Sequence, residues 1–360
     1  MNFFFRVDAS IQIGNGHVLR CLTLAKNLRS RGQDCIFICR PHLGNLKAMI
    51  AEAGFEVVLL PAVASSIDEP FDPYQNWIGD SWENDIHQTI DLVKHRQVDW
   101  IVIDHYGIES KWEEVAKKVL LANLMVIDDL ADNLHNCTLL LDQTFARNAD
   151  EYIHLVPNNC ELLLGSQFAL LRDDFNRVRI DSIQRRKNFE LRNILVSMGG
   201  VDGSNVTQRV LNALSNLKLE LSVKVILGSN SPWINQVQKF IELKNPSMEL
   251  LIDVKNMAEL MLESDLIIGA AGTTSWERCC LGVPSIVIQL AENQRNILRV
   301  LSDHRAIISI KGVDIEDEIV KQVTLLKKNP KIADELSSNA LDLVDGLGSN
   351  RVVDALLRVR

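Results

Sequence analysis

A histidine stands at the start of an expected helix, directly behind a loop that contains glycines. The apolar run Phe3 to Val7 leads into the loop DASIQIGNGH at positions 8–17, after which apolar residues recur at helical spacing. Such a loop lets backbone N–H groups approach a ligand, and a helix N-terminus favours an anion. The helix dipole disfavours a protonated imidazole there, so His17 is suited to act as a base. A capping or packed histidine is the alternative, and the absence of GxGxxG spacing argues against a nicotinamide site.

A second loop of small residues follows the apolar run Leu266 to Ile268 and opens another expected helix. It reads GAAGTTSWE at positions 269–277. The N–H groups and hydroxyls of such a loop suit a diphosphate, which predicts contacts from Gly272, Thr273 and Thr274. Glu277 falls about one turn into the helix, where a carboxylate is placed to accept both hydroxyls of a ribose. Compensation of the helix dipole is its alternative role.

The pattern of strand, glycine loop and helix returns at Ser197 to Asn205, a segment that contains Gly199 and Gly200. Parallel strands of an open α/β sheet bind ligands at their carboxyl edge. This loop and the loop at 269–277 are therefore expected to point toward the same ligand.

Two amide side chains follow a further apolar run, Ser285 to Ile288. Asn293 and Gln294 are therefore expected at the same edge of the second sheet. Their amides are suited to hydrogen-bond sugar or phosphate oxygens, and a role of Glu292 or Asn293 in starting a helix is the alternative.

Acidic residues end two apolar runs in the first half of the chain. Asp104 precedes His105, Tyr106 and Gly107, and the pair Asp128-Asp129 follows a run that ends at Ile127. An aspartate at a strand end commonly caps the following turn, and no EF-hand or HExxH spacing is present, so we predict no metal site. For Tyr106, orientation of a substrate and burial in the core stay open.

These residues need strands and helices in alternation to hold them. Short runs rich in Val, Ile and Leu, separated by helical stretches, are typical of parallel sheets covered on both faces. The first series comprises Phe3 to Val7, Asp34 to Cys39, Val57 to Leu60, Trp100 to Ile103, Met125 to Ile127, Leu139 to Leu141 and Leu162 to Leu164. The second comprises Asn193 to Met198, Val223 to Leu227, Met248 to Ile252, Leu266 to Ile268, Ser285 to Ile288 and Ala306 to Ser309.

Two doubly wound domains follow from the two series. We place an N-terminal Rossmann-like domain at 1–175, a C-terminal one at 190–345 and a last helix at 346–360 that packs back on the first domain. The basic stretch Arg172 to Arg192 is expected to be a solvated connection between them. A long excursion with little periodicity is expected at Ala62 to Trp82.

Composition narrows the function classes. The chain has 360 residues, 47 acidic against 38 basic side chains, a net charge of −9 and 47% apolar residues. A chain of this charge is a poor partner for nucleic acid, and no run reaches the ~18 apolar residues of a membrane span. Seven cysteines without a CxxC pair are typical of reduced thiols, which predicts a cytoplasmic protein. We make no prediction of oligomeric state.

Several motifs together resemble a known family. The segments RVDASIQIGNGHVLRCLTLA, IDHYG, IDDLAD, LLLDQT, ILVSMGG and IGAAGTTSWERCCLGVPSIVIQLAENQ run from residue 6 to 294. They closely resemble the UDP-2,4-diacetamido-2,4,6-trideoxy-β-L-altropyranose hydrolases of pseudaminic acid (nonulosonic acid) biosynthesis. More remotely the chain is similar to the GT-B glycosyltransferase that builds lipid II.

The resemblance implies a GT-B fold, with two doubly wound Rossmann-like domains facing across a cleft that holds the UDP-sugar. It implies a hydrolase that releases UDP and free 2,4-diacetamido-2,4,6-trideoxy-L-altrose, by attack of water at C1 with inversion. It implies no cofactor and no divalent metal. His17 would be the catalytic base. The expected substrate-binding residues are Asp8, Gly14, Gly16, Arg20, Tyr106, Gly199, Gly200, Gly272, Thr273, Thr274, Glu277, Asn293 and Gln294.

Three other functions fit parts of the pattern. A GT-B glycosyltransferase with a UDP-sugar donor would use His17 to deprotonate an acceptor hydroxyl in place of water. A nucleotide-sugar binding protein without turnover would tolerate the loss of His17. A hydrolysing 2-epimerase of UDP-N-acetylhexosamines would need acid and base groups on both faces of C2, whereas one clear base is visible here.

Overall fold

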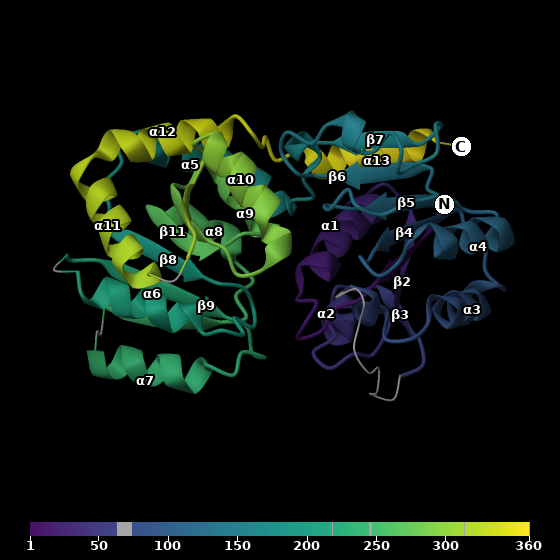
Figure 1. Ribbon diagram of the computed structural model, residues 1–360, viewed down its shortest axis with the longest axis horizontal. Coiled ribbons are helices and arrows are strands. Elements are labelled where there is room, and N and C mark those ends of the chain that lie inside the picture. The colour runs from purple at the N-terminus through teal and green to yellow at the C-terminus, as the bar shows by residue number, and fades with distance from the viewer. Residues whose placement is uncertain (63–73, 218, 245–246, 313, 360) are drawn as a thin grey trace. The chain divides into compact units, whose positions relative to one another are not determined.

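A computed structural model of the chain describes residues 1–62, 74–217, 219–244, 247–312 and 314–359. The chain divides into two compact units, each built on its own parallel sheet (Figure 1). Unit 1 comprises Met1–Leu170 and Gly348–Arg360, and unit 2 comprises Leu171–Leu347. No helix in the described part of the chain has the length and apolar character that crossing a membrane requires.

Unit 1 contains a seven-stranded parallel sheet in the order β3-β2-β1-β4-β5-β6-β7. Its strands are β1 (Asn2–Val7), β2 (Asp34–Cys39), β3 (Glu56–Leu59), β4 (Trp100–Asp104), β5 (Asn123–Ile127), β6 (Leu139–Asp142) and β7 (Glu161–Leu164). Every apolar run predicted as a strand in this half forms one, because strands buried on both faces are apolar throughout.

Helices cover both faces of this sheet, as the three consecutive phenylalanines of β1 show. Phe3 and Phe5 pack with residues of α1 and α13, whereas Phe4 points to the opposite face and packs with α3 and α4. The α-helices are α1 (Gly16–Ser30), α2 (Lys47–Glu52), α3 (Trp82–Val93), α4 (Ser110–Leu120) and α13 (Gly348–Arg358). Short 3₁₀ turns are η1 (Gln75–Ile78), η2 (Ala149–Glu151) and η3 (Ser166–Phe168). The last helix contacts α1, which places the end of the chain in unit 1.

The excursion expected at 62–82 is described only in part. Residues 63–73 lie outside the described residues. The remainder forms η1 and then enters α3 at Trp82, where the Ser81 hydroxyl caps the helix by accepting the N–H of Asn84.

Unit 2 repeats the architecture with six parallel strands in the order β10-β9-β8-β11-β12-β13. Its strands are β8 (Asn193–Ser197), β9 (Ser222–Leu227), β10 (Met248–Ile252), β11 (Leu266–Ala270), β12 (Ser285–Ile288) and β13 (Ile308–Ile310). The helices are α5 (Asp173–Arg186), α6 (Val206–Ser215), α7 (Ile234–Lys244), α8 (Met257–Glu263), α9 (Thr274–Leu281), α10 (Arg295–Asp303), α11 (Ile315–Lys328) and α12 (Pro330–Leu341), with η4 at Glu292–Gln294. The predicted strands of the second series all form.

The basic stretch at 172–192 is not the solvated connection that we expected. It forms α5, which contacts α8 and α9 inside unit 2. Arg179 donates to the carbonyl oxygens of Cys280 and Leu341, and Arg186 donates to that of Met261. These guanidinium groups bind the carbonyl ends of neighbouring helices and loops, a role that charge counting along the sequence does not reveal.

Strand order determines which loops of unit 1 lie together. β1 lies between β2 and β4, and the register pairs Val7 with Asp104. The order therefore reverses direction at β1 and β4, where open α/β sheets bind ligands at the carboxyl edge. The loop at 8–15 and the residues that follow Asp104 both begin at this edge.

Candidate functional site

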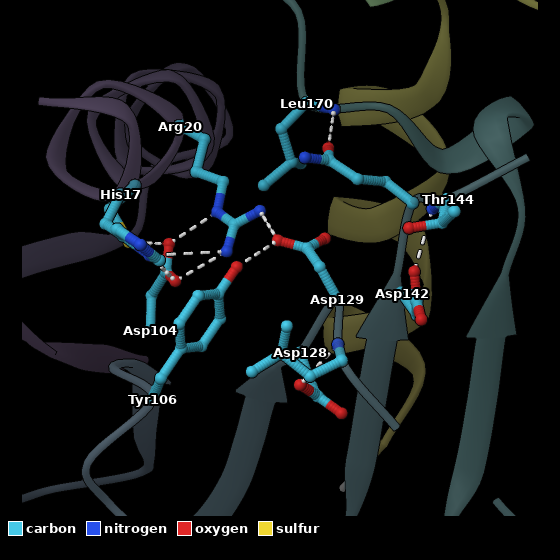
Figure 2. Close-up of polar contacts among 12 residues, drawn as sticks. His17, Arg20, Asp104, Tyr106, Asp128, Asp129, Asp142, Thr144 and Leu170 are labelled. Atoms are coloured by element: carbon cyan, nitrogen blue, oxygen red, sulfur yellow. Dashed lines mark hydrogen bonds and ion pairs between the residues drawn. The ribbon is translucent and has the colours of Figure 1, made fainter. Parts of the chain in front are cut away.

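His17 is fixed by an aspartate from the neighbouring strand. Its Nδ1 lies 2.6 Å from Oδ1 of Asp104, the last residue of β4 (Figure 2). Helix α1 begins at Gly16, so the ring projects from the first helical turn, and 10% of its side chain is exposed. The Asp104 side chain is fully buried. The pair thus joins the helix behind the first glycine loop to the adjacent strand end.

Arg20 holds the same carboxylate from the next turn of α1. Its Nε and Nη2 donate to the two oxygens of Asp104 at 2.7 Å each, and its Nη1 donates to Oδ2 of Asp129 at 2.6 Å. Residues three apart lie on one face of a helix, which brings His17 and Arg20 to one carboxylate. Burial alone would raise the pKa of Asp104, but the charge of Arg20 and the contact with His17 hold it well below its usual value.

This arrangement determines the tautomer of the imidazole. An ionised Asp104 has only acceptors to offer, so Nδ1 of His17 carries the hydrogen and donates it. In the neutral ring Nε2 then holds the lone pair that can take a proton. A histidine oriented by a buried carboxylate is the arrangement of a general base.

Aromatic rings surround the imidazole. The Tyr106 ring lies edge-on to His17 with centroids 4.8 Å apart, and the Trp77 ring is edge-on at 5.7 Å. Trp77 and Tyr106 stack on each other at 5.4 Å. The Tyr106 hydroxyl donates to Oδ2 of Asp129 at 2.9 Å, and its pKa is raised well above the usual value by burial and by Asp129. Tyr106 therefore stays protonated and links the aromatic group to the Arg20 ion pairs.

Two residues that we assigned to the substrate are used internally. Asp8 has a fully buried side chain, which pairs with Nη1 of Arg6 at 2.7 Å and accepts the backbone N–H of Arg40 at 2.6 Å. Arg20 is likewise buried between its carboxylates. These contacts hold the first loop and His17 in place. The role of Asp8 and Arg20 toward a substrate stays a prediction.

The two predicted glycines of the first loop have different structural roles. Gly14 adopts φ +80°, and its N–H donates to the carbonyl of Ser10 at 2.8 Å, which closes a tight turn that favours glycine. Gly16 is the first residue of α1. The turn brings the chain from β1 to the helix that carries His17.

The loop after β11 in unit 2 offers free backbone donors to an anion. Gly272 adopts φ +152°, and its N–H is turned inward to the Ser275 hydroxyl at 3.3 Å. Within the described residues, no acceptor takes the N–H of Thr273 or Thr274 at the start of α9. Two adjacent free N–H groups at a helix N-terminus form a binding position for a phosphate. Our predicted residues Gly272, Thr273 and Thr274 therefore lie together.

Glu277 lies on the first turn of α9, with 16% of its side chain exposed. Burial raises its pKa to about 7, and Arg172, whose Nη2 lies 3.9 Å away, opposes the rise. A carboxylate that is half ionised near neutral pH can accept hydrogen bonds from hydroxyl groups when it loses its proton. Its ribose role stays a prediction.

The remaining predicted residues of unit 2 lie on other loops at the same sheet edge. Gly199, with φ +96°, and Gly200 follow β8, and the Gly200 carbonyl lies 2.7 Å from where a Cβ of Gly228 would be. Gln294 belongs to η4 after β12, and its Oε1 accepts the N–H of Leu290 at 2.8 Å. That bond stabilises a turn. The side chain of Asn293 lies outside the described residues.

The acidic residues at the ends of β5 and β6 interact with protein groups. Asp128 accepts the N–H groups of Leu130 and Ala131 at 3.0 Å each, which is the turn-capping role considered from the sequence. Burial and the nearby Asp129 raise the pKa of Asp142 to about 7. In the described ranges no group of three or more His, Cys, Asp or Glu residues is arranged to hold a metal ion.

Sequence reasoning missed the partners of His17. Asp104 was treated as a turn residue and Asp129 as part of an acidic pair, whereas Asp104 contacts His17 directly and Asp129 is joined to Asp104 by Arg20. Trp77 was not singled out. The available signal was an aspartate at a strand end, but which strand neighbours β1 could not be read from the chain.

Comparisons with known proteins agree with this architecture. Residues 193–351 match the model of the glycosyltransferase family 28 C-terminal domain. The chain is 29% identical over 297 residues to UDP-2,4-diacetamido-2,4,6-trideoxy-β-L-altropyranose hydrolase of Campylobacter jejuni, which covers 82% of this chain and 94% of that protein. The resemblance drawn from the motifs is confirmed. Spore coat polysaccharide biosynthesis protein SpsG of Bacillus subtilis is 23% identical over 355 residues, covering 97% of this chain and 96% of that protein.

Solved structures establish the fold. MurG of Acinetobacter baumannii superimposes with a TM-score of 0.68 at 14% identity, covering 99% of each chain. UDP-GlcNAc 2-epimerase of Neisseria meningitidis, solved with UDP-GlcNAc, gives a TM-score of 0.65 at 13% identity, again covering 99% of each chain. The chain has a GT-B fold with two Rossmann-like α/β domains, as predicted.

Proposed function

We propose that this chain is a UDP-sugar hydrolase. Its substrate is UDP-2,4-diacetamido-2,4,6-trideoxy-β-L-altropyranose, and its products are UDP and free 2,4-diacetamido-2,4,6-trideoxy-L-altrose, in pseudaminic acid biosynthesis. The observation that carries the proposal is the contact between His17 and the buried Asp104, which provides an oriented base. The sugar is proposed from the similarity to the Campylobacter jejuni hydrolase.

The proposed reaction is a displacement at C1. Nε2 of His17 takes a proton from water while the water oxygen bonds to C1 and the bond from C1 to the diphosphate oxygen breaks. UDP leaves with that bonding pair, and the configuration at C1 inverts. Asp104 stabilises the imidazolium that forms, because its carboxylate holds the ring through Nδ1.

Unit 2 binds the leaving group in this proposal. The free N–H groups of Thr273 and Thr274 bind phosphate oxygens, so negative charge that develops on departure meets donors already in place. Glu277 accepts the ribose hydroxyls. No divalent metal is required in this mechanism, because backbone donors and the helix dipole stabilise the diphosphate.

Purified protein, treated with EDTA and given the UDP-diacetamido-trideoxyaltrose without any acceptor, tests the proposal. Proton NMR follows UDP release and the anomer of the first free sugar. We expect UDP and the inverted sugar in equal amounts at an undiminished rate after chelation. No release in the absence of an acceptor would contradict a hydrolase.

A glycosyltransferase is the second candidate, favoured by the family 28 match over residues 193–351. His17 would then deprotonate an acceptor hydroxyl, with the same Asp104 contact. A transferase leaves the UDP-sugar intact until an acceptor is added, so the NMR experiment separates the two functions.

A further inference from the structure

Arg278 is a buried guanidinium beneath the loop that follows β11. Only 2% of the residue is exposed. Its Nη2 donates to the carbonyl of Ala270 at 3.0 Å and to the hydroxyl of Ser275 at 2.9 Å. Its Nη1 lies 3.5 Å from the hydroxyl of Thr274. These partners are the last residue of β11 and two residues of the first turn of α9.

This arginine lacks the partner that buried arginines usually have. No carboxylate of the described residues lies within salt-bridge distance of its guanidinium, and its buried Nε has no hydrogen-bond partner there. Burial lowers the pKa of Arg278 to about 10, so the group stays charged at neutral pH. A buried charge without a counter-charge is destabilising. The neighbouring Glu277 opposes the lowering of the Arg278 pKa from beyond salt-bridge distance. The fold therefore keeps a buried positive charge at this position that no salt bridge within the described residues neutralises.

A glycine on β11 makes room for the guanidinium. A Cβ on Gly269 would lie 2.9 Å from Nη1 of Arg278 and 2.8 Å from the carbonyl oxygen of Ser197. Gly269 pairs with Ser197 in the sheet. Arg278 thus lies where β8 and β11 run side by side, at the ends that lead into the two glycine loops of unit 2.

The hydrogen bonds of Arg278 also determine which loop groups are free. Binding by Arg278 turns the Ala270 carbonyl away from solvent and holds the Ser275 hydroxyl, which accepts the N–H of Gly272. The N–H groups of Thr273 and Thr274 remain unpaired within the described residues. The loop therefore presents N–H donors to an anion, while the carbonyl at the end of β11 binds Arg278.

We infer that Arg278 is a positioning residue for the diphosphate of the UDP-sugar: it fixes the loop at 270–274 from beneath and supplies the positive charge that a bound diphosphate neutralises. The inference rests on the proposed nucleotide site of unit 2. Arg278 donates to protein groups, so it acts on the diphosphate through the loop and through its field. Arg278 therefore contributes to the binding of the phosphates and not to the binding of the uridine.

Binding of UDP, UMP and uridine, measured by calorimetry, tests the inference. Arg278→Gln removes the charge, and Arg278→Lys keeps the charge but loses the bidentate hydrogen-bond donor of the guanidinium. Arg186→Gln is the matched control, because Arg186 is also buried in unit 2 and also donates to main-chain carbonyls, those at the end of α8. Chemical unfolding of each variant shows that the ligands meet folded protein.

We expect Arg278→Gln to lower the affinity for UDP about ten- to hundredfold and the affinity for uridine less than about twofold. The UDP affinity of Arg278→Lys should lie between those of the wild type and Arg278→Gln. Arg186→Gln should bind UDP as the wild type does. Equal losses for UDP and uridine, or the same UDP loss in Arg186→Gln, would overturn the inference and leave a structural arginine. If the wild type itself binds no UDP, the proposed nucleotide site fails, and the inference fails with it. If Arg278→Gln does not fold, Arg278→Lys carries the same comparison.

Discussion

Nδ1 of His17 lies 2.6 Å from Oδ1 of Asp104, and Arg20 donates two hydrogen bonds to the same carboxylate. One buried carboxylate therefore orients the imidazole, and one arginine keeps that carboxylate ionised. Because the pKa of Asp104 is so low, the carboxylate does not take the proton from the imidazole. It stabilises the imidazolium without removing its charge. This relationship leads to the first two predictions.

Replacement of His17 by alanine should abolish most turnover and leave UDP binding unchanged. General-base help is worth about 10² to 10⁴ in rate, while the proposed nucleotide contacts all lie in unit 2. Single-turnover release of UDP gives the rate, and calorimetry with UDP gives the affinity. Near-normal turnover in His17→Ala would remove the residue from the mechanism.

Replacement of Asp104 by asparagine should lower turnover by on the order of 10² or more, because the ring loses the carboxylate that sets its tautomer. The same change removes a counter-charge from the buried Arg20 and should reduce the free energy of unfolding. Adding Asp104→Asn to His17→Ala should cost no further turnover, since both act through the ring. An additive loss in the double variant would show that Asp104 acts independently of His17.

The affinity for uridine should fall as the pH is lowered through neutrality. Glu277 has a pKa raised to about 7 by burial, and in the proposed site only its ionised form would accept both ribose hydroxyls. Lowering the pH from about 8 to about 6 protonates this carboxyl, so binding weakens on the acid side. Uridine is the suitable ligand because it carries no phosphate that titrates in this range.

Glu277→Gln provides the control for that titration. Its amide cannot ionise, so uridine should bind more weakly than to the wild type at the alkaline end and with a flat pH dependence. A wild-type profile that is flat as well would take Glu277 out of the ribose site.

The features that could be predicted from the sequence are those that neighbouring residues in the chain determine. The strands were recognisable because each is a short apolar run, and the glycine loops because a strand, a turn and a helix follow in order. His17 and Asp104 are 87 positions apart in the sequence. They meet because β4 pairs with β1 on the side opposite to β2. Strand order depends on packing of the whole sheet, so the partner of His17 could not be read from spacing.

The misassigned arginines have a related cause. The basic residues of α5 were read as solvated, although Arg186 is buried and donates to carbonyls of α8. The long aliphatic stem of arginine lets a charged residue reach such carbonyls from a helix of low overall hydrophobicity. The amino-acid composition gives the charge of an arginine but not the carbonyl group to which it donates.

The buried ion pairs behind the first loop should dominate the acid sensitivity of unit 1. Asp85 of α3 is fully buried and accepts hydrogen bonds from Arg6 at 2.7 Å and Arg40 at 2.6 Å, with the Trp112 indole N–H at 3.0 Å. Asp85→Asn leaves two buried guanidinium groups short of a counter-charge, which should lower the free energy of unfolding by roughly 3 to 5 kcal/mol. Urea unfolding at neutral pH measures the change.

The pH dependence of the same variant has a definite sign. Burial alone would raise the pKa of Asp85, but the charge of Arg6 and the hydrogen bonds of both arginines lower it. A carboxyl with a lowered pKa stabilises the fold above its unfolded pKa of about 3.8, and that contribution is lost as the pH falls. Stability of the wild type should therefore decline toward acid more steeply than that of Asp85→Asn. Asp91→Asn, which removes an exposed carboxylate from the same helix, should match the wild type in both measurements; if it weakens the fold as Asp85→Asn does, burial of the ion pairs is not the cause.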